Sequence, residues 1–375
     1  MPVKNEKIFQ EFCDNRGLAE GTIGNYKVAL QRYSNFTNKT LEELIQEADD
    51  EEEANIKMRK RKIKLYLFGF KRWLREQEYS DTYTNHLIVL VRSFYSEYDI
   101  ELPKNLKRKS RRDKKQETIE DLPTMDDVKK SLEYSSHTYM ALTLLMVSSG
   151  MSRAEVCSLT FENFYKAVGL PKDFKKPLPD LIERVKSMDN LIPIWKIRRV
   201  KTSRPYFTFC SPQATNAILE YLGQQYRAYE WQPKPEDQLF RNYELPITRS
   251  AVSRQYQRIN KIAGFPKVNN KILIRPHSLR KLFATTLEKN RMPHLMIRWL
   301  MGHTIDGTTD AYFKADPEAL KIEYLNVVNA LSTNEVEVTT ITTEGYREVK
   351  DEIEELKLRQ VLYERQINAL KQDKN

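Results

Sequence analysis

A dense run of basic residues divides this 375-residue chain into two parts, and it limits the possible folds more than any other feature. From Lys104 to Lys115 there are eight basic residues and one acid, which gives a net charge of +7 over twelve positions. Such a run cannot bury itself, because most of its charges would have no partner. Pro103 and Pro123 flank it. The sequence therefore predicts an extended basic linker over about 102–123, with a folded domain on each side.

The charge of the whole chain points to a polyanionic partner. Lys and Arg total 62 and Asp and Glu total 52, so the net charge is +10, an excess that most often indicates nucleic-acid binding. Two interpretations of the linker stay open: a solubilising tether, or a strap that lies along DNA phosphates and releases counterions. The linker cations expected to contact double-stranded DNA are Lys104, Lys107, Arg108, Lys109, Arg111, Arg112, Lys114 and Lys115.

Apolar periodicity and a shortage of glycine predict a mainly helical protein. Only 11 of the 375 residues are Gly, where about 7% is usual. Before the linker, apolar side chains recur at spacings of three and four over Thr22–Phe36, Ile63–Leu74 and Thr82–Tyr98. The acidic run Asp49–Glu53 is expected to be a solvated loop rather than a metal site, because consecutive residues do not converge on one ion. Residues 1–101 should form a small helical bundle.

Residues 124–332 are expected to form a second domain that adds a small β element to its helices. β-forming residues on both sides of Lys201-Thr-Ser-Arg-Pro205 predict a β-hairpin over 191–210. Thr124, with an acid three residues later, is typical of a helix start. Helices are expected over 125–134, 137–148, 212–227, 248–263, 276–289, 293–301 and 317–331. The predicted fold class is mainly α, with a mixed α/β second domain.

The final segment, 333–375, carries a heptad pattern. Seven positions from Val349 to Leu370 are spaced alternately by four and three residues, and six of them are apolar or aromatic. A seam this short is only marginally a coiled coil on its own, so a helix packed on its own domain fits equally well. We expect a helical C-terminal extension in which 346–371 helps subunits associate.

Membrane and secreted classes fit the sequence poorly. The best apolar stretch, Met140–Val147, is far shorter than a membrane span, and the first residues hold no apolar signal segment. Cys13, Cys157 and Cys210 lie far apart without a CxxC pair, so neither a disulfide scaffold nor a Cys-based zinc site is expected. We expect a cytoplasmic, nucleoid-associated protein.

Six residues of the second domain together suit phosphoryl transfer. Two arginines can hold a phosphodiester and neutralise its charge, and a tyrosine can attack phosphorus to form a phosphotyrosine. Histidine and lysine can supply hydrogen bonds and a proton for the leaving oxygen. No carboxylate cage for Mg²⁺ accompanies them, so the expected reaction uses no metal and no cofactor. These candidates are Arg153, Lys201, His277, Arg280, His303 and Tyr312.

Two segments carry a family resemblance. His277-Ser-Leu-Arg280 opens a helix after Arg275-Pro276, and Leu-Met-Gly-His303 is followed nine residues later by Tyr312. Found together and in this order, they resemble the signature boxes of the tyrosine recombinases, the lambda-integrase and Xer-like families. The residues of these segments are most similar to those of integrases of archaeal viruses and plasmids. The resemblance covers about 124–331 and extends loosely to 1–101, which is similar to the family's helical core-binding domain.

The resemblance implies a role for each candidate. Arg280 matches the second catalytic arginine, and Arg153 is the candidate for the first. Both would bind the scissile phosphate. His277 and His303 match the two box histidines, which would hydrogen-bond the phosphate or assist proton transfer. Lys201 falls at the family's β-hairpin lysine, the expected general acid, and Tyr312 matches the nucleophile. Three cations that precede Lys201 are expected to contact phosphates along the groove: Lys196, Arg198 and Arg199. Glu155 corresponds to the acid after the first arginine.

The first arginine departs from the family pattern by one position. Counting from Gly150, the family has Arg two residues on, where this chain has Ser152, and Arg153 follows. A slip of one residue rotates a side chain by about 100° on a helix. Either the helix starts one residue later, or Arg153 reaches the phosphate from a different backbone position.

The implied function is DNA strand exchange through a 3′-phosphotyrosyl intermediate, by a tetramer on DNA. Integration or excision of a mobile element is the favoured role. The alternatives are Xer-like dimer resolution, relaxation by a type IB topoisomerase-like monomer, and a non-catalytic DNA-binding relic.

Overall fold

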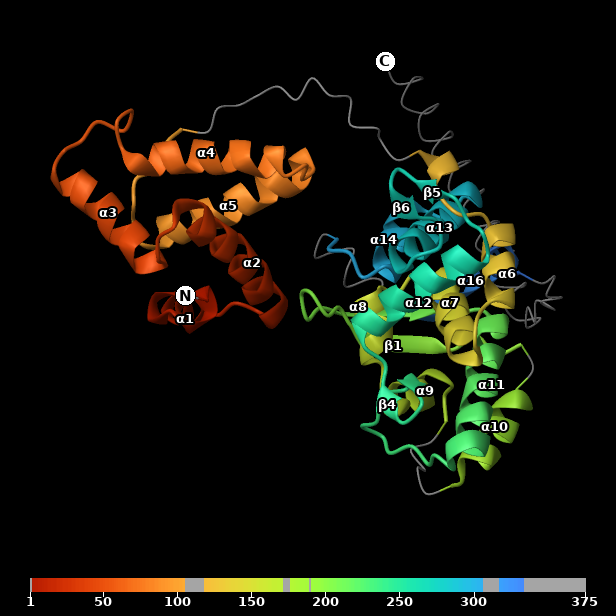
Figure 1. Cartoon of the computed structure of the whole chain (residues 1–375). Helices are drawn as coiled ribbons and strands as arrows, with labels where there is room; N and C mark the ends of the chain where they lie inside the picture. Colours follow the sequence, from red (N-terminus) through yellow and green to blue (C-terminus); the bar gives the residue numbers. More distant parts are fainter. Residues whose placement is uncertain (1, 105–117, 171–175, 189, 306–316, 334–375) are drawn as a thin grey trace, which may run out of the picture. The chain divides into compact units, whose positions relative to one another are not determined.

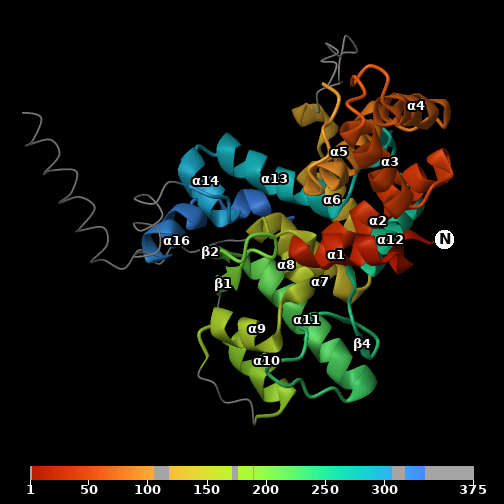
Figure 2. The ribbon, with the colours of Figure 1, turned by 90° about the vertical axis from the view of Figure 1, so that its left-hand side faces the viewer.

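The computed structural model describes residues 2–104, 118–170, 176–188, 190–305 and 317–333. The chain forms two compact units, Met1–Asp113 and Lys114–Asn375, each taken by itself below (Figures 1 and 2). The division falls inside the predicted linker. The linker's residues 105–117 and the heptad tail lie outside the described residues.

The N-terminal unit is a bundle of helices, as predicted. Its helices are η1 (Val3–Asn5), α1 (Lys7–Asn15), α2 (Glu20–Thr37), α3 (Leu41–Glu53), α4 (Lys62–Glu76) and α5 (Asp81–Glu97). Buried aromatic rings from four of them meet edge to face, among them Phe12 with Phe94 and Tyr33 with Phe70. Such pairs stabilise a core beyond the area they bury. The three predicted helices correspond to α2, α4 and α5.

The acidic run Asp49–Glu53 is not a loop, and that prediction was wrong. It forms the last residues of α3, which starts at a capping box formed by Thr40 and Glu43. Glu51 is buried and accepts a hydrogen bond from the Lys62 backbone amide at 2.8 Å. The carboxylates therefore cap and pair with the chain that enters α4, so their charge does not prevent a helix.

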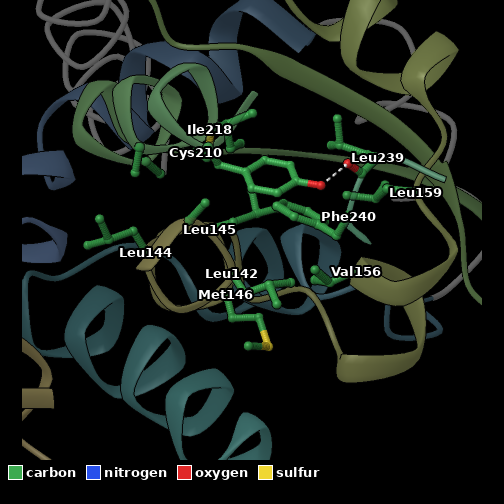
Figure 3. Packing of buried hydrophobic residues seen from close by; sticks show 14 of the residues in the cluster. Leu142, Leu144, Leu145, Met146, Val156, Leu159, Cys210, Ile218, Leu239 and Phe240 are labelled. Atoms are coloured by element: carbon green, nitrogen blue, oxygen red, sulfur yellow. Dashed lines mark hydrogen bonds between the residues drawn. The ribbon is translucent and has the colours of Figure 1, made fainter. Parts of the chain in front are cut away.

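The C-terminal unit is built around one nearly wholly buried helix, α7 (His137–Ser149). It packs against α11 (Pro212–Tyr229) and α13 (Pro276–Lys289). Figure 3 shows Leu142 and Leu145 of α7 and Ile218 of α11 among the side chains of this core. The other helices are η2 (Ile119–Asp121), α6 (Met125–Glu133), α8 (Arg153–Ser158), α9 (Phe161–Ala167), α10 (Leu178–Lys186), α12 (Arg249–Ile262), α14 (His294–Leu300), α16 (Pro317–Leu325) and η3 (Val328–Leu331).

The predicted β-hairpin is present as strands β1 (Ile194–Arg198) and β2 (Pro205–Phe209). They pair antiparallel, with Lys196 opposite Phe207. Three backbone hydrogen bonds close the turn between them: Arg199 N–H to Arg204 O at 2.8 Å, Thr202 N–H to Arg199 O at 3.3 Å and Ser203 N–H to Arg199 O at 2.7 Å. Two smaller hairpins are β3 (Arg241–Asn242) with β4 (Leu245–Pro246), and β5 (Lys267–Val268) with β6 (Lys271–Ile272). The mainly α fold class with a small β element is confirmed.

Two further sequence expectations bear on the described residues. Cys13, Cys157 and Cys210 are all free thiols and all buried. Across the ranges that the structure describes, every helix is too short or too polar to cross a membrane.

Candidate active site

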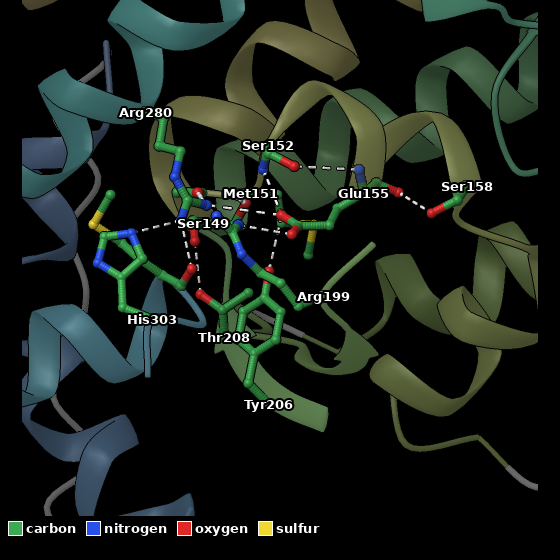
Figure 4. Close-up of polar contacts among 12 residues, drawn as sticks. Ser149, Met151, Ser152, Glu155, Ser158, Arg199, Tyr206, Thr208, Arg280 and His303 are labelled. Atoms are coloured by element: carbon green, nitrogen blue, oxygen red, sulfur yellow. Dashed lines mark hydrogen bonds and ion pairs between the residues drawn. The ribbon is translucent and has the colours of Figure 1, made fainter. Parts of the chain in front are cut away.

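A buried carboxylate, that of Glu155, organises a cluster of polar groups in the C-terminal unit (Figure 4). One oxygen, Oε1, lies 2.8 Å from Nη1 of Arg199. The other, Oε2, accepts from the backbone N–H of Ser152 at 2.7 Å and from the Tyr206 hydroxyl at 3.1 Å. Nη1 of Arg280 lies 3.7 Å from the same oxygen. Because Glu155 is only 2% exposed, this pairing and hydrogen bonding offset its desolvation.

Local sequence at the end of α7 places this carboxylate. Gly150 ends the helix with φ +66°, and a Cβ there would come within 2.6 Å of Phe283 Cε1. Ser152 then caps α8, and Glu155 completes the capping box at its third position. The helix therefore starts at Arg153, one residue later than the family spacing. The one-residue slip leaves Ser152 as the cap and Arg153 as the first helical residue.

Arg280 is buried within the same cluster. It comes from α13, is 6% exposed, and donates to the backbone oxygens of Gly150 and Met301. Its Nη2 also lies 3.3 Å from Nε2 of His303. Burial, followed by the positive charge of Arg199, lowers the pKa of Arg280, but a guanidinium stays protonated at neutral pH. Arg280 therefore supplies a fixed positive charge that the fold holds in one orientation.

His303 sits just after α14, against the hairpin. Its carbonyl oxygen accepts from Nη1 of Arg204 at 2.7 Å, and the preceding Gly302 packs against the ring of Tyr206. Burial, and then the charges of Arg280 and Arg199, lower the pKa of His303 to about 4. The imidazole is thus neutral near pH 7. Since arginine can only donate, the contact with Arg280 makes Nε2 the acceptor and leaves the proton on Nδ1.

Arg153 points away from Glu155 towards a neighbouring cavity. Its Nη1 donates to Ser253 Oγ on α12. The cavity measures about 490 Å³, and its wall includes five basic side chains, those of Arg153, Arg249, Arg275, His277 and Arg280. His277 is exposed there. Arg280 therefore lies between two features, the Glu155 cluster and this cavity, and the two candidates Arg153 and His277 belong to the cavity.

The remaining candidates lie at the surface or outside the described residues. Lys201 is exposed in the hairpin turn, and Lys104 is exposed at the start of the linker. Tyr312 is outside the described residues. So are the linker cations Lys107, Arg108, Lys109, Arg111, Arg112, Lys114 and Lys115.

Arg199 is the residue whose position differs most from expectation. It was expected to follow the groove with Lys196 and Arg198, and those two are exposed. Arg199 instead directs its guanidinium inward to Glu155, and its side chain is 19% exposed. Alternation along a strand applies up to Arg198, where β1 ends, so it could not give the direction of the next side chain. The signal available in the sequence was Ser152, which stands where the family has its first arginine.

The cluster and the cavity together form a site suited to an anion. The guanidiniums of Arg199 and Arg280 pair with Glu155, and the neutral imidazole of His303 contacts Arg280. Four more basic side chains line the adjoining cavity. Arginine binds phosphate oxygens in a planar, bidentate manner. The arrangement therefore suits a phosphodiester and the charge that develops on it during transfer.

Comparison with known proteins agrees with this chemistry. Residues 183–319 match the Phage integrase family, a range that contains the hairpin, both histidine boxes and Tyr312. A tyrosine recombinase XerD of Halalkalibacterium halodurans is 24% identical over 310 residues, covering 79% of this chain and 88% of the relative. A tyrosine recombinase XerD of Oceanobacillus iheyensis is 22% identical over 337 residues, covering 85% of this chain and 96% of the relative.

Solved structures of similar fold include proteins bound to DNA. One is a XerH site-specific recombinase on palindromic difH substrate, with a TM-score of 0.51 and 17% identity over 84% of this chain and 82% of that one. Another is a lambda integrase(75-356) dimer on a COC′ core site, with a TM-score of 0.51 and 13% identity over 81% of this chain and 92% of that one. At such identities the likeness concerns the fold.

Proposed function

We propose that this chain is a tyrosine recombinase that cleaves and rejoins double-stranded DNA at specific sites through Tyr312, a proposal supported by the family match and the two relatives. The enzyme class, a site-specific recombinase, follows from the family match and the two recombinase relatives. The observation that carries the chemical part is the Arg280–His303 pair, which the Glu155 cluster holds beside a basic cavity. Those groups would bind the scissile phosphate.

The proposed step is a transesterification. The Tyr312 hydroxyl loses its proton and attacks phosphorus, while the bond from phosphorus to the 5′ oxygen breaks. The 5′ oxygen takes a proton from Lys201 and leaves as a hydroxyl. A 3′-phosphotyrosyl ester remains, and attack by a 5′-hydroxyl of a partner strand reverses the step. Because the ester conserves the phosphodiester energy, the reaction needs no nucleotide hydrolysis.

The first test uses nicked suicide duplexes, in which the short strand downstream of the cleavage point diffuses away and traps the covalent complex. A pool of duplexes covering the attachment region of the source element is incubated in EDTA with wild type or Tyr312→Phe. We expect a covalent protein–DNA band on a denaturing gel for wild type alone. Retarded native complexes without a covalent band on any duplex would refute cleavage and favour a DNA-binding relic.

The role in the cell belongs to the same proposal. We favour integration or excision of a mobile element, because of the basic linker and the C-terminal extension. Strand exchange between two plasmids bearing the mapped site tests this role against dimer resolution within one plasmid. Supercoil relaxation without exchange would indicate the topoisomerase-like alternative. The two relatives give no support to an origin in an archaeal virus or plasmid.

The proposed working unit is a tetramer on DNA, assembled with the help of 346–371. Recombination of two duplexes cuts four strands, so four active sites must act together. A chain truncated after Ser332 should then bind a single site as wild type does and fail to form higher complexes. Mass photometry of complexes on the mapped site measures both. Equal assembly by the truncated chain would refute the role of the tail. Nucleoid association would follow from DNA binding.

A further inference from the structure

We propose that Arg199, rather than Arg153, is the second arginine that acts with Arg280 on the scissile phosphate. This assignment rests on the proposed function. It gives a catalytic role to a residue that lies outside the family's signature boxes and two positions before Lys201. Three observations support it: the sharing of Glu155, the reach of the Arg199 charge, and the different engagement of Arg153.

Glu155 holds two guanidiniums, and they are those of Arg199 and Arg280. Arg199 Nη1 lies 2.8 Å from Oε1, and Arg280 Nη1 lies 3.7 Å from Oε2. A carboxylate with one arginine on each oxygen fixes both cations beside one another. Arg280 also donates to two backbone oxygens and contacts His303, so much of its donor capacity is used by the fold. Arg199 has five N–H donors, and its side chain is the more exposed of the two.

The positive charge of Arg199 acts on Arg280 and His303, the two residues expected to bind the phosphate. It is among the positive charges that lower the pKa of Arg280 and of His303. The charge of Arg153 acts instead on the thiol of Cys157. Since electrostatic influence falls with distance, the Arg199 guanidinium belongs to the Arg280–His303 centre and that of Arg153 does not.

Arg153 is turned towards α12 by its place on α8. As the first helical residue after the Ser152 cap, it donates to Ser253 Oγ and lines the cavity beside Arg249 and Arg275. Such a position suits the backbone of a neighbouring nucleotide, where a cation positions DNA without entering the reaction. The one-residue shift of Arg153 in the sequence thus agrees with a role in positioning DNA rather than in the reaction.

The hairpin also joins Arg199 to Lys201. The Arg199 N–H bonds Arg204 O, and the Arg199 carbonyl accepts from Thr202 at 3.3 Å and Ser203 at 2.7 Å. Arg199 is therefore anchored at the base of the turn that carries the proposed general acid. Phosphate binding by Arg199 would place the turn, and with it Lys201, over the same phosphodiester. One turn would supply both charge neutralisation and the proton for the 5′ oxygen.

The test compares four variants on two substrates, at the cleavage position mapped with wild type. The first substrate is a suicide duplex with a normal scissile phosphate, and the second carries a neutral methylphosphonate there. Arg199→Gln should slow covalent complex formation by about 100-fold or more on the phosphate, the loss typical of removing one charge-stabilising donor. On the methylphosphonate the deficit should shrink to below tenfold, because little charge remains to neutralise. Arg199→Lys should fall between wild type and Arg199→Gln.

The other two variants are Arg153→Gln and the exposed Arg184→Gln of α10. Arg153→Gln should lose less than tenfold, by the same factor on both substrates, and Arg184→Gln should match wild type. The assignment is overturned if Arg153→Gln shows the large, methylphosphonate-rescued loss. It is also overturned if Arg199→Gln loses less than tenfold, or loses equally on both substrates, as a merely structural residue would. Thermal midpoints of all four variants report their folding.

The wild-type arm separates this inference from the proposed function. A wild-type phosphotyrosyl band establishes the function, and the variants then decide the assignment alone. If wild type forms no such band on any duplex, the proposed function fails and the assignment falls with it.

Discussion

Replacing Gly150 with alanine should destabilise the C-terminal unit for two separable reasons. The first is backbone conformation, because Gly150 has φ +66°, where an L-residue is disfavoured by about 1–2 kcal/mol. The second is space, because a Cβ would lie 2.6 Å from Phe283 Cε1 in the core, and overpacking costs about 1–3 kcal/mol. The sum, about 2–5 kcal/mol, is reduced slightly because alanine also restricts the unfolded chain, by about 0.4–1 kcal/mol.

Gly264 offers a matched control for the first reason. It has φ +70° at the end of α12, and a Cβ there meets no atom within 4 Å. Gly264→Ala therefore carries the conformational cost and the unfolded-state effect without the clash. The difference between the two variants isolates overpacking, about 1–3 kcal/mol. At about 2–4 °C per kcal/mol for a unit of this size, Gly150→Ala should melt about 2–12 °C below Gly264→Ala.

Tryptophan fluorescence of the full chain can follow this melting. Three of the four tryptophans, Trp195, Trp231 and Trp299, lie in the C-terminal unit. Because Gly150 O accepts from Arg280, the variant should also slow covalent complex formation, whereas Gly264→Ala should not. Equal melting points for the two alanine variants would refute the packing argument, since the clash with Phe283 is the main difference between them.

Further predictions concern charge. Glu155→Gln should lower stability by about 3 kcal/mol or more, because it leaves a buried guanidinium without its carboxylate; a shift equal to that of the exposed control Glu183→Gln would contradict this. The folded pKa of His303 is about 4, below the usual 6.5. The unfolded chain therefore binds the proton first, and stability is lost as the pH falls from about 6.5 to 4. His303→Gln should reduce that loss in melting curves at both pH values, and an identical loss would count against it. If the linker lies along DNA phosphates, replacing four of its cations with Gln should reduce the slope of log Kd against log salt concentration by about 3.6. An unchanged slope would indicate a tether.

The sequence predicted most helices because their apolar residues are periodic. Burial of one face fixes a helix whatever the rest of the fold does, so Ile63–Leu74 and Thr82–Tyr98 correspond closely to α4 and α5. The acidic end of α3 was missed because its stability comes from partners elsewhere in the chain, the Lys62 amide and Arg61. Pattern alone does not reveal such partners.

The site was predictable where a motif names its residues. The two boxes assigned Arg280 and His303 to one site, and the structure brings these residues to 3.3 Å although 23 positions separate them in the sequence. The inward direction of Arg199 was not predictable, because it depends on how the turn leaves β1 and on a carboxylate 44 positions earlier. Spacing from Gly150 identified the anomaly at Arg153, and the capping box at Ser152 explains it.

The hairpin turn has a fixed length for a mechanical reason. Arg199 and Arg204 stand at its two ends, and one binds Glu155 while the other binds the His303 carbonyl. An inserted residue lengthens a chain by up to about 3.3–3.6 Å, more than a hydrogen bond can stretch. One of the two anchors would have to release. We therefore expect this turn to keep its residue count during divergence.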